Sequence, residues 1–296
     1  MIASFIARAL NKLRLIHRYK SRDIIPVSKF NISLRIKIND AVFKVPILNK
    51  TGWENLFLTG GWFTDLLLYL KANKDWTVID IGANIGQTLL KVKSIAREIN
   101  YLGFEPNPAC INYLNKLIDR NKLNNCLLFP VGLSNKTQLL KFYHYTESET
   151  DPAASIIPDY RPESNSKKST LVPVFDLKEI SEISELNKIE LIKIDVEGAE
   201  LEVLQSCKEI IAKHKPLIII EILPVYTSDN LIRRQRQEKI EELISLLNYK
   251  IYLIKKGRNE CFNTLEEKET IGIHDNIINI DYLLTPAQLN QSLIIK

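Results

Sequence analysis

The 296-residue chain has few cysteines and histidines, and it has no long apolar run. Its cysteines stand far apart without a Cys-x-x-Cys pair, so we expect neither a zinc ribbon nor a disulfide framework. The histidines are equally scattered and form no His-x3-His or His-Glu-x-x-His motif, which argues against a histidine-based metal centre. No apolar run approaches the ~18 residues of a membrane span. A reducing, cytoplasmic location is therefore expected.

The chain also lacks an excess of charge over most of its length. Its formal net charge is +5, but residues 1–29 alone carry seven basic side chains against Asp23. The remaining 267 residues hold 33 basic and 34 acidic side chains. Binding to a phosphate backbone usually needs a basic surface, so nucleic acid is not an expected partner.

The basic N-terminus has an amphipathic pattern. Apolar residues between 2 and 16 fall within one arc of about 140° at helical spacing, with arginines outside it. Because basic residues interrupt the apolar face and no cleavage site follows, the segment does not match a secretory signal. Two uses remain open: the helix packs on its own domain or on a partner, or it lies on a membrane surface. Residues 1–20 are thus a candidate for peripheral membrane contact.

The next segment changes period and predicts an N-terminal extension. Alternating apolar residues over 31–47, interrupted by Asn39-Asp40, predict a β-hairpin. A helix is expected in 53–73, after Gly60-Gly61. We therefore divide the chain into a basic helix (1–29), a hairpin and helix packed on the core (30–74), and a main domain (75–296).

The main domain alternates strand and helix patterns, which predicts an α/β fold. Aliphatic strands separated by helices indicate a Rossmann-like, doubly wound sheet that is mostly parallel. Residues 249–255 and 277–284 have no helix pattern between them and predict an antiparallel strand pair at the sheet edge. Residues 144–169 form the one long polar loop, whose length is typical of a lid, a binding loop or disorder.

The most informative motif follows the first core strand. Gly82 ends the strand and allows a sharp turn, while Gly86 lets the next helix approach. A dinucleotide fingerprint would place glycines at 82, 84 and 87, but Asn84 and Gln87 occupy two of these positions. With Asp80 at the strand end, the loop suits a ligand with an ammonium and a carboxylate better than a pyrophosphate.

Acidic residues end three further strands. Glu105 lies 19 residues beyond Gly86, where such folds bind ribose hydroxyls. Asp195 and Glu197 share one side of the strand that contains Lys193, and they suggest proton abstraction or orientation of an accepting group. Glu221 ends an aliphatic strand, where a carboxylate is costly without a partner.

The runs VIDIGANIGQTLL, LGFEPNP, LIKIDVEGAELEVLQ and PLIIIEIL together resemble the FkbM family of S-adenosylmethionine-dependent methyltransferases, which have a class I Rossmann-like fold. The similarity covers about residues 40–285 and includes the final NIDYLLTP. It implies S-adenosylmethionine as cofactor, with Asp80, Gly82 and Gly86 around its methionine part, Glu105 on the ribose and Pro130–Gly132 near the adenine. Asn84 and Asp195 complete the expected cofactor-binding set.

The resemblance implies O-methylation of a hydroxyl on a sugar, glycolipid, polysaccharide or secondary metabolite. We predict Glu197 as the base, Asp195 as the orienting group and Glu221 as a further catalytic carboxylate, with His144 as the fallback base. No resident metal is assigned, although Asp195 and Glu221 could hold one Mg²⁺. Only Ala154-Ser155-Ile156 represents a serine-rich stretch of the family, so the acceptor cannot be transferred from it.

Three other functions compete with this one. A methyltransferase acting on nucleic-acid bases would show Asp/Asn-Pro-Pro-aromatic where this chain has Asp195-Val-Glu-Gly. A nicotinamide oxidoreductase is disfavoured by the glycine spacing. The main alternative is a non-catalytic cofactor-binding module that docks through its N-terminal helix.

Overall fold

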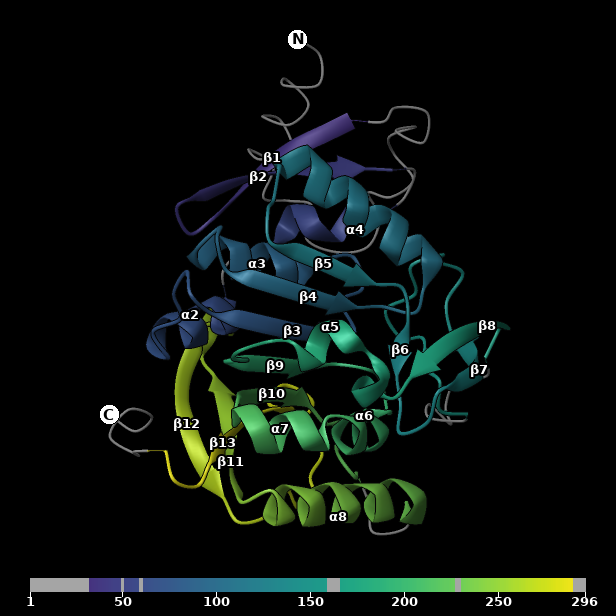
Figure 1. Ribbon diagram of the computed structural model, residues 1–296, viewed down its shortest axis with the longest axis vertical. Helices are drawn as coiled ribbons and strands as arrows, with labels where there is room; N and C mark the ends of the chain where they lie inside the picture. Colours follow the sequence, from purple (N-terminus) through teal and green to yellow (C-terminus); the bar gives the residue numbers. More distant parts are fainter. Residues whose placement is uncertain (1–31, 49–50, 59–60, 159–165, 227–229, 290–296) are drawn as a thin grey trace.

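Figure 1 shows the protein as a computed structural model, which describes residues 32–48, 51–58, 61–158, 166–226 and 230–289. The predicted amphipathic helix and the proposed boundary at residue 29 lie outside these ranges. Within them, no helix has the length and apolar character of a membrane span.

An eight-stranded sheet forms the centre of the molecule, with the order β12-β11-β13-β10-β9-β3-β4-β5. Five neighbouring strands are parallel: β3 (Thr77–Ile81), β4 (Asn100–Phe104), β5 (Cys126–Phe129), β9 (Leu191–Ile194) and β10 (Leu217–Glu221). The predicted mostly parallel sheet is confirmed.

The C-terminal strands complete the sheet in a way that differs in part from the prediction. The expected antiparallel pair is present as β11 (Tyr249–Lys256) and β13 (Asp281–Pro286), but β13 lies inside, between β10 and β11. The edge is the unpredicted β12 (Phe262–Lys268). Its sequence FNTLEEK is charged, as befits an exposed edge, and it forms ion pairs such as Lys250–Glu267 with β11.

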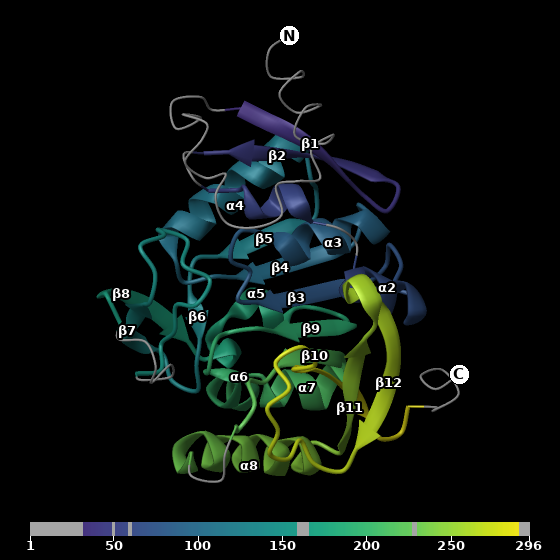
Figure 2. The ribbon, with the colours of Figure 1, turned by 180° about the vertical axis from the view of Figure 1, so that it is seen from behind.

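Helices cover both faces of this sheet (Figures 1 and 2). Alternate strand residues enter two separate cores, because successive side chains point to opposite faces. Val78 and Ile219 pack with α2 (Gly61–Tyr69), α3 (Gln87–Ile95) and α4 (Pro108–Asn121). Ile79 and Ile218 belong to the core beneath α5 (Ser181–Ser184), α6 (Glu200–Ser206), α7 (Lys208–His214) and α8 (Leu231–Leu246). The doubly wound arrangement is thus confirmed.

The predicted hairpin is also confirmed, as β1 (Ile32–Ile38) and β2 (Ala41–Ile47), and it is followed by the 3-10 helix η3 (Glu54–Phe57). Phe43 and Val45 are fully buried in the core that contains α3 and α4. The side chain of Asn121 in α4 accepts from the backbone N–H of Lys44 and donates to its carbonyl oxygen, at 2.6 and 2.8 Å. The hairpin is therefore fixed to the main domain.

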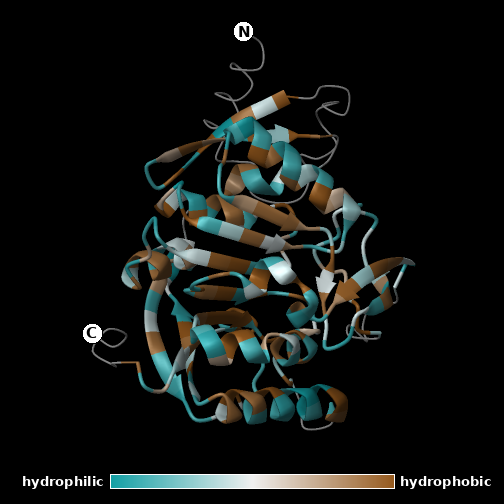
Figure 3. Cartoon of the chain, in the orientation of Figure 1, coloured by the Kyte–Doolittle hydropathy of each residue, from teal (hydrophilic) through white to brown (hydrophobic). Residues whose placement is uncertain are grey.

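A three-stranded sheet, β6-β8-β7, stands beside the large sheet. It consists of β6 (Gly132–Leu133), β7 (Gln138–His144) and β8 (Lys168–Phe175). The 3-10 helices η4 (Leu177–Glu179) and η5 (Arg258–Glu260) occur elsewhere. Neither β8 nor α8 was predicted. Figure 3 shows why α8 was missed: most of it is hydrophilic, and only its inner residues Gln237, Ile240, Leu243 and Ile244 are buried.

Candidate active site

The turn between β3 and α3 needs glycine at two places. Gly82 has φ +90°, and a Cβ there would lie 1.9 Å from the carbonyl oxygen of Asp195. Gly86 has φ +82°, and a Cβ there would meet Leu114 and Leu117 of α4 at 2.8 Å. The two glycines therefore let the turn pass close to β9 and let α3 pack on α4, as their positions predicted.

Glu105 follows β4 and is tied to this turn. Its two carboxylate oxygens accept hydrogen bonds from the backbone N–H groups of Asn84 and Asn107, both at 2.8 Å. Only 4% of the residue is exposed, and this burial raises its pKa to about 7. A carboxylate oxygen accepts more than one hydrogen bond, so Glu105 keeps capacity for two ligand hydroxyls.

Asp80 does not occupy the predicted position at the cofactor. It is fully buried, accepts a hydrogen bond from the hydroxyl of Tyr101 and lies 4.0 Å from the ammonium of Lys193. Burial raises the pKa of Asp80. Asp80 does not line the cavity that joins Glu105 to Asp195, so the expected contact with the methionine part is corrected to a supporting contact with Lys193.

Lys193 joins Asp80 to Asp195. Its ammonium donates to a carboxylate oxygen of Asp195 at 2.8 Å. Burial alone would lower the pKa of Lys193, but the carboxylates of Asp195 and Asp80 outweigh it and raise the pKa. The raised pKa favours the charged form of Lys193, so the site contains an internal cation, a role that was not predicted from the sequence.

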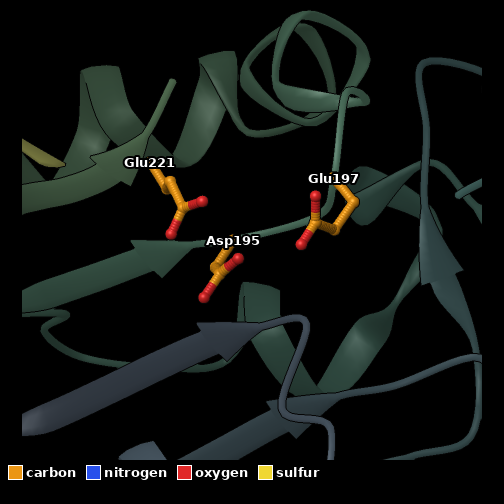
Figure 4. A group of neighbouring side chains, drawn as sticks. All are labelled: Asp195, Glu197 and Glu221. Atoms are coloured by element: carbon orange, nitrogen blue, oxygen red, sulfur yellow. The ribbon is translucent and has the colours of Figure 1, made fainter. Parts of the chain in front are cut away.

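Asp195, Glu197 and Glu221 form one cluster of three carboxylates. Asp195 directly follows β9, Glu221 ends the neighbouring strand β10, and Glu197 comes from the turn after β9, as Figure 4 shows. One carboxylate oxygen of each lies within 4.8 Å of the others. Burial and the nearby carboxylates of Asp195, Asp281 and Glu197 raise the pKa of Glu221 well above its usual range. The predicted juxtaposition of the three residues is confirmed.

A cavity of about 1210 Å³ connects Glu105 with this cluster. Its lining contains nine carboxylate side chains and three lysines, so its surface favours a cation. Of the predicted site residues, it is lined by Gly82, Asn84, Glu105, Gly132, Asp195, Glu197 and Glu221. Gly86 packs behind the turn instead.

His144 does not join the cluster. It ends β7 and is 4% exposed; its Nε2 lies 3.1 Å from the hydroxyl of Thr170, and its ring meets Phe142 edge-on. Burial and the nearby Lys168 lower its pKa. Since His144 does not line the cavity, the structure does not place it as the fallback base.

Further lining residues were not identified from the sequence. Lys256 of β11 forms an ion pair with Asp281 at 2.6 Å, and its ammonium lies 4.9 Å from the ring centre of Trp62. Asp281 pairs with Glu221 in the antiparallel register of β10 and β13. The sequence signal for Asp281 is an acidic residue at the start of an apolar strand. This signal predicts a place at the site only if the strand is known to run antiparallel to β10.

The Methyltransferase FkbM domain model matches residues 80–254. "Methyltransferase 1" of Beauveria bassiana is 28% identical over 146 residues, which span 45% of this chain and 58% of that protein. Methyltransferase sdnD of Sordaria araneosa is 27% identical over 158 residues, which span 45% and 60%. The chain thus covers less than two thirds of either fungal protein.

Two more relatives come from prokaryotes. Hexuronic acid methyltransferase AglP of Haloferax volcanii is 26% identical over 182 residues, which span 62% of this chain and 70% of that protein. The crystal structure of methyltransferase FkbM from Methylobacillus flagellatus has 17% identity and a TM-score of 0.44, over 72% of this chain and 44% of that chain. The family model covers more than half of the chain, including the strand ends that carry Glu105 and the three carboxylates. The chain belongs to the FkbM methyltransferase family.

Proposed function

We propose that the protein is an S-adenosylmethionine-dependent O-methyltransferase acting on a hydroxyl of a sugar, glycolipid, polysaccharide or secondary metabolite. The observation that carries this proposal is the single cavity that joins Glu105 to the carboxylates of Asp195, Glu197 and Glu221. Membership of the FkbM family supports methyltransferase activity, and the similarity to a hexuronic acid methyltransferase supports a sugar acceptor.

The cavity lining fits the cofactor chemically. Glu105 can accept hydrogen bonds from ribose hydroxyls, and the backbone of Gly82 to Asn84 is open to the methionine part. The excess of carboxylates suits a positively charged sulfonium. When bound, S-adenosylmethionine supplies an activated methyl group whose transfer needs an acceptor oxygen in line with the carbon–sulfur bond.

The residues of the chain then have two tasks: they align the acceptor hydroxyl, and they receive its proton. Asp195 is held by Lys193 and can accept a hydrogen bond that orients the hydroxyl. Glu197 is the base that takes the proton. Glu221, whose raised pKa favours its protonated form, can donate a hydrogen bond to the acceptor or to a neighbouring carboxylate.

The test is a methyl-transfer assay with the full chain over a panel of glycans and lipid-linked sugars, with calorimetric titration of S-adenosylmethionine and NAD(H) in parallel. We expect S-adenosylmethionine to bind, NAD(H) not to bind, and at least one hydroxyl acceptor to be methylated. Binding without turnover on any acceptor would favour the alternative, a non-catalytic cofactor-binding module. Methylation of nitrogen or of a carboxylate alone would refute the hydroxyl assignment.

Peripheral membrane contact through residues 1–20 belongs to the same proposal, supported by the basic amphipathic pattern of that segment. A lipid-linked acceptor would make such contact useful. Co-sedimentation of the full chain with anionic vesicles, compared with neutral vesicles, tests it. Equal binding to both vesicle types, or to neither, would contradict it.

A further inference from the structure

The turn that carries Glu197 has an unusual backbone. Glu197 has φ +53° and Gly198 has φ +107°. A non-glycine residue in the left-handed region is strained, and such strain persists only where the surrounding structure enforces it. The contacts that enforce it here come from three different segments.

Two of these contacts act on Gly198. Its carbonyl oxygen accepts from the guanidinium of Arg236 in α8 at 2.8 Å, and its N–H donates to the carboxylate of Glu200 at 2.8 Å. Arg236 is itself fixed by an ion pair with Glu202. The C-terminal side of the turn is therefore attached to α6 and α8.

The contact with Glu197 itself comes from the loop between β7 and β8. The hydroxyl of Ser155 donates to the carbonyl oxygen of Glu197 at 2.6 Å. Ser155 is fully buried, and its backbone forms two hydrogen bonds with Tyr143 of β7, at 2.8 and 3.0 Å. The hydroxyl also accepts from the N–H of Ile157 at 3.0 Å, which fixes the direction in which it donates.

The same loop lines the cavity. Its residues Thr146 to Pro152 face the cavity, and buried Asp151 orders the loop by accepting the N–H groups of Tyr145, Thr146 and Ala153. Its other attachment is the side chain of Asn107, which donates to the carbonyl oxygen of Glu149 at 2.8 Å. One segment thus spans from the neighbour of Glu105 to the backbone of Glu197.

We propose that Ser155 is a positioning residue: through its hydrogen bond it holds Glu197 in the left-handed turn, and so links the cavity-lining β7–β8 loop to the carboxylate that takes the acceptor proton. This inference rests on the proposed function, because it needs Glu197 as the base. Ser155 lies outside the cavity lining and acts only through Glu197.

The experiment measures kcat, the KM of the acceptor and the Kd of S-adenosylmethionine for Ser155→Ala. Losing a hydrogen bond of about 1.5 kcal/mol corresponds to about a tenfold fall in kcat, because the base leaves its position. The Kd of S-adenosylmethionine is expected to stay within twofold, and KM should change less than kcat. Ser206→Ala is the matched control: Ser206 is also buried and its hydroxyl accepts from the N–H of Leu177 at 2.7 Å, but it does not line the cavity or contact the turn.

A double mutant separates positioning from general destabilisation. In a Glu197→Gln background, Ser155→Ala should cause no further loss, because the group on which it acts is gone. A full additional tenfold loss there, or wild-type kcat in Ser155→Ala, would overturn the proposal. If Ser155→Ala does not fold, Ser155→Cys keeps the volume while weakening the donor, and the same fall in kcat is expected.

The failure of this inference can be told apart from failure of the proposed function. Glu197→Gln with wild-type turnover removes Glu197 as the base, whatever Ser155→Ala does. Glu197→Gln with low turnover beside a normal Ser155→Ala enzyme refutes only the positioning role.

Discussion

Two buried lysines, Lys93 of α3 and Lys193 of β9, lie at opposite ends of the parallel strands of the large sheet, and their surroundings differ. At the amino-terminal end, fully buried Lys93 donates to the backbone carbonyl oxygens of Arg97, Ile99, Asn124 and Asn125, at 2.6 to 3.3 Å. At the carboxyl-terminal end, Lys193 is 9% exposed and faces the carboxylates of Asp195 and Asp80. Burial lowers the pKa of Lys93, whereas the carboxylates raise that of Lys193.

The difference shows that a buried charge does not by itself indicate a functional site. Lys93 joins the loops that precede β4 and β5, and its own side chain does not line the cavity. Lys193 lines the cavity and compensates a group of carboxylates there. Ligands bind at the carboxyl ends of strands in open α/β sheets, so substitutions at the two ends should affect different quantities.

The largest expected effect lies at the carboxyl-terminal end. Glu197→Gln should lower kcat by about 100- to 10,000-fold, since it removes the proton acceptor while keeping the shape of the side chain. Glu190→Gln is the control at the other end, where the carboxylate accepts the N–H of Thr77 at 2.7 Å. Steady-state kinetics should show normal kcat for the control. Near-normal kcat for Glu197→Gln would remove Glu197 as the base.

The next effect lies at the amino-terminal end and concerns stability. Lys93→Met leaves four carbonyl oxygens without their charged donor, and we expect the free energy of unfolding to fall by about 3 kcal/mol. Denaturant unfolding measures this change. Calorimetry on the folded fraction should give an unchanged Kd for S-adenosylmethionine. A Lys93→Met protein with unchanged stability and weakened cofactor binding would contradict the claim that the amino-terminal end affects stability and not ligand binding.

Glu105→Ala should weaken S-adenosylmethionine binding about tenfold or more, because a hydrogen bond to a charged group is worth about 1.5–3 kcal/mol. The exposed Glu98, at the amino-terminal end of β4, provides the control Glu98→Ala. Isothermal titration calorimetry gives both Kd values. Equal values for the two variants would remove Glu105 from the cofactor site.

A pH effect of similar or smaller size follows from the pKa of Glu105, which burial raises to about 7. Ribose hydroxyls need the carboxylate form, so affinity should rise about tenfold between pH 6 and 8 as Glu105 loses its proton. The contribution of Glu105 to the free energy of unfolding changes in the opposite direction. Because the pKa of Glu105 is higher in the folded protein than in the unfolded chain, this stabilising contribution is complete below pH 4.5 and is lost as the pH rises through about 7. In Glu105→Gln, calorimetry should find the rise in affinity missing. The same rise in both proteins would show that another group titrates.

Much of this architecture could be predicted because local patterns decide it. The buried strands β3, β4 and β10 and the glycine turn at Gly82 depend on burial and backbone conformation, which neighbouring residues specify. The sequence also predicts that Glu105, Asp195 and Glu221 lie at the carboxyl ends of strands, and all three line the cavity.

The remaining features depend on contacts between distant segments. The family resemblance implies that Asp80 contacts the cofactor, but Asp80 contacts the hydroxyl of Tyr101 and the ammonium of Lys193 instead and does not line the cavity. The charged β12 and α8 lack the apolar pattern that predicts buried elements, because each exposes most of one side. Ser155 lies 42 positions from Glu197 in a polar loop, and nothing local indicates that its hydroxyl is buried against the turn.

The smallest expected effect is that of metal removal. Asp195, Glu197 and Glu221 offer three oxygen ligands of the kind that Mg²⁺ accepts. However, Lys193 already donates to Asp195 at 2.8 Å and supplies a positive charge beside the carboxylates. A divalent ion would add a second positive charge at the same place. At the amino-terminal end, by contrast, the hydrogen bonds of Lys93 to backbone carbonyl oxygens involve neutral acceptors. We therefore expect turnover to change by less than twofold after exhaustive EDTA treatment and desalting. A loss of turnover that added Mg²⁺ restores would show that the cluster binds a metal, and Glu221→Gln should then abolish that restoration.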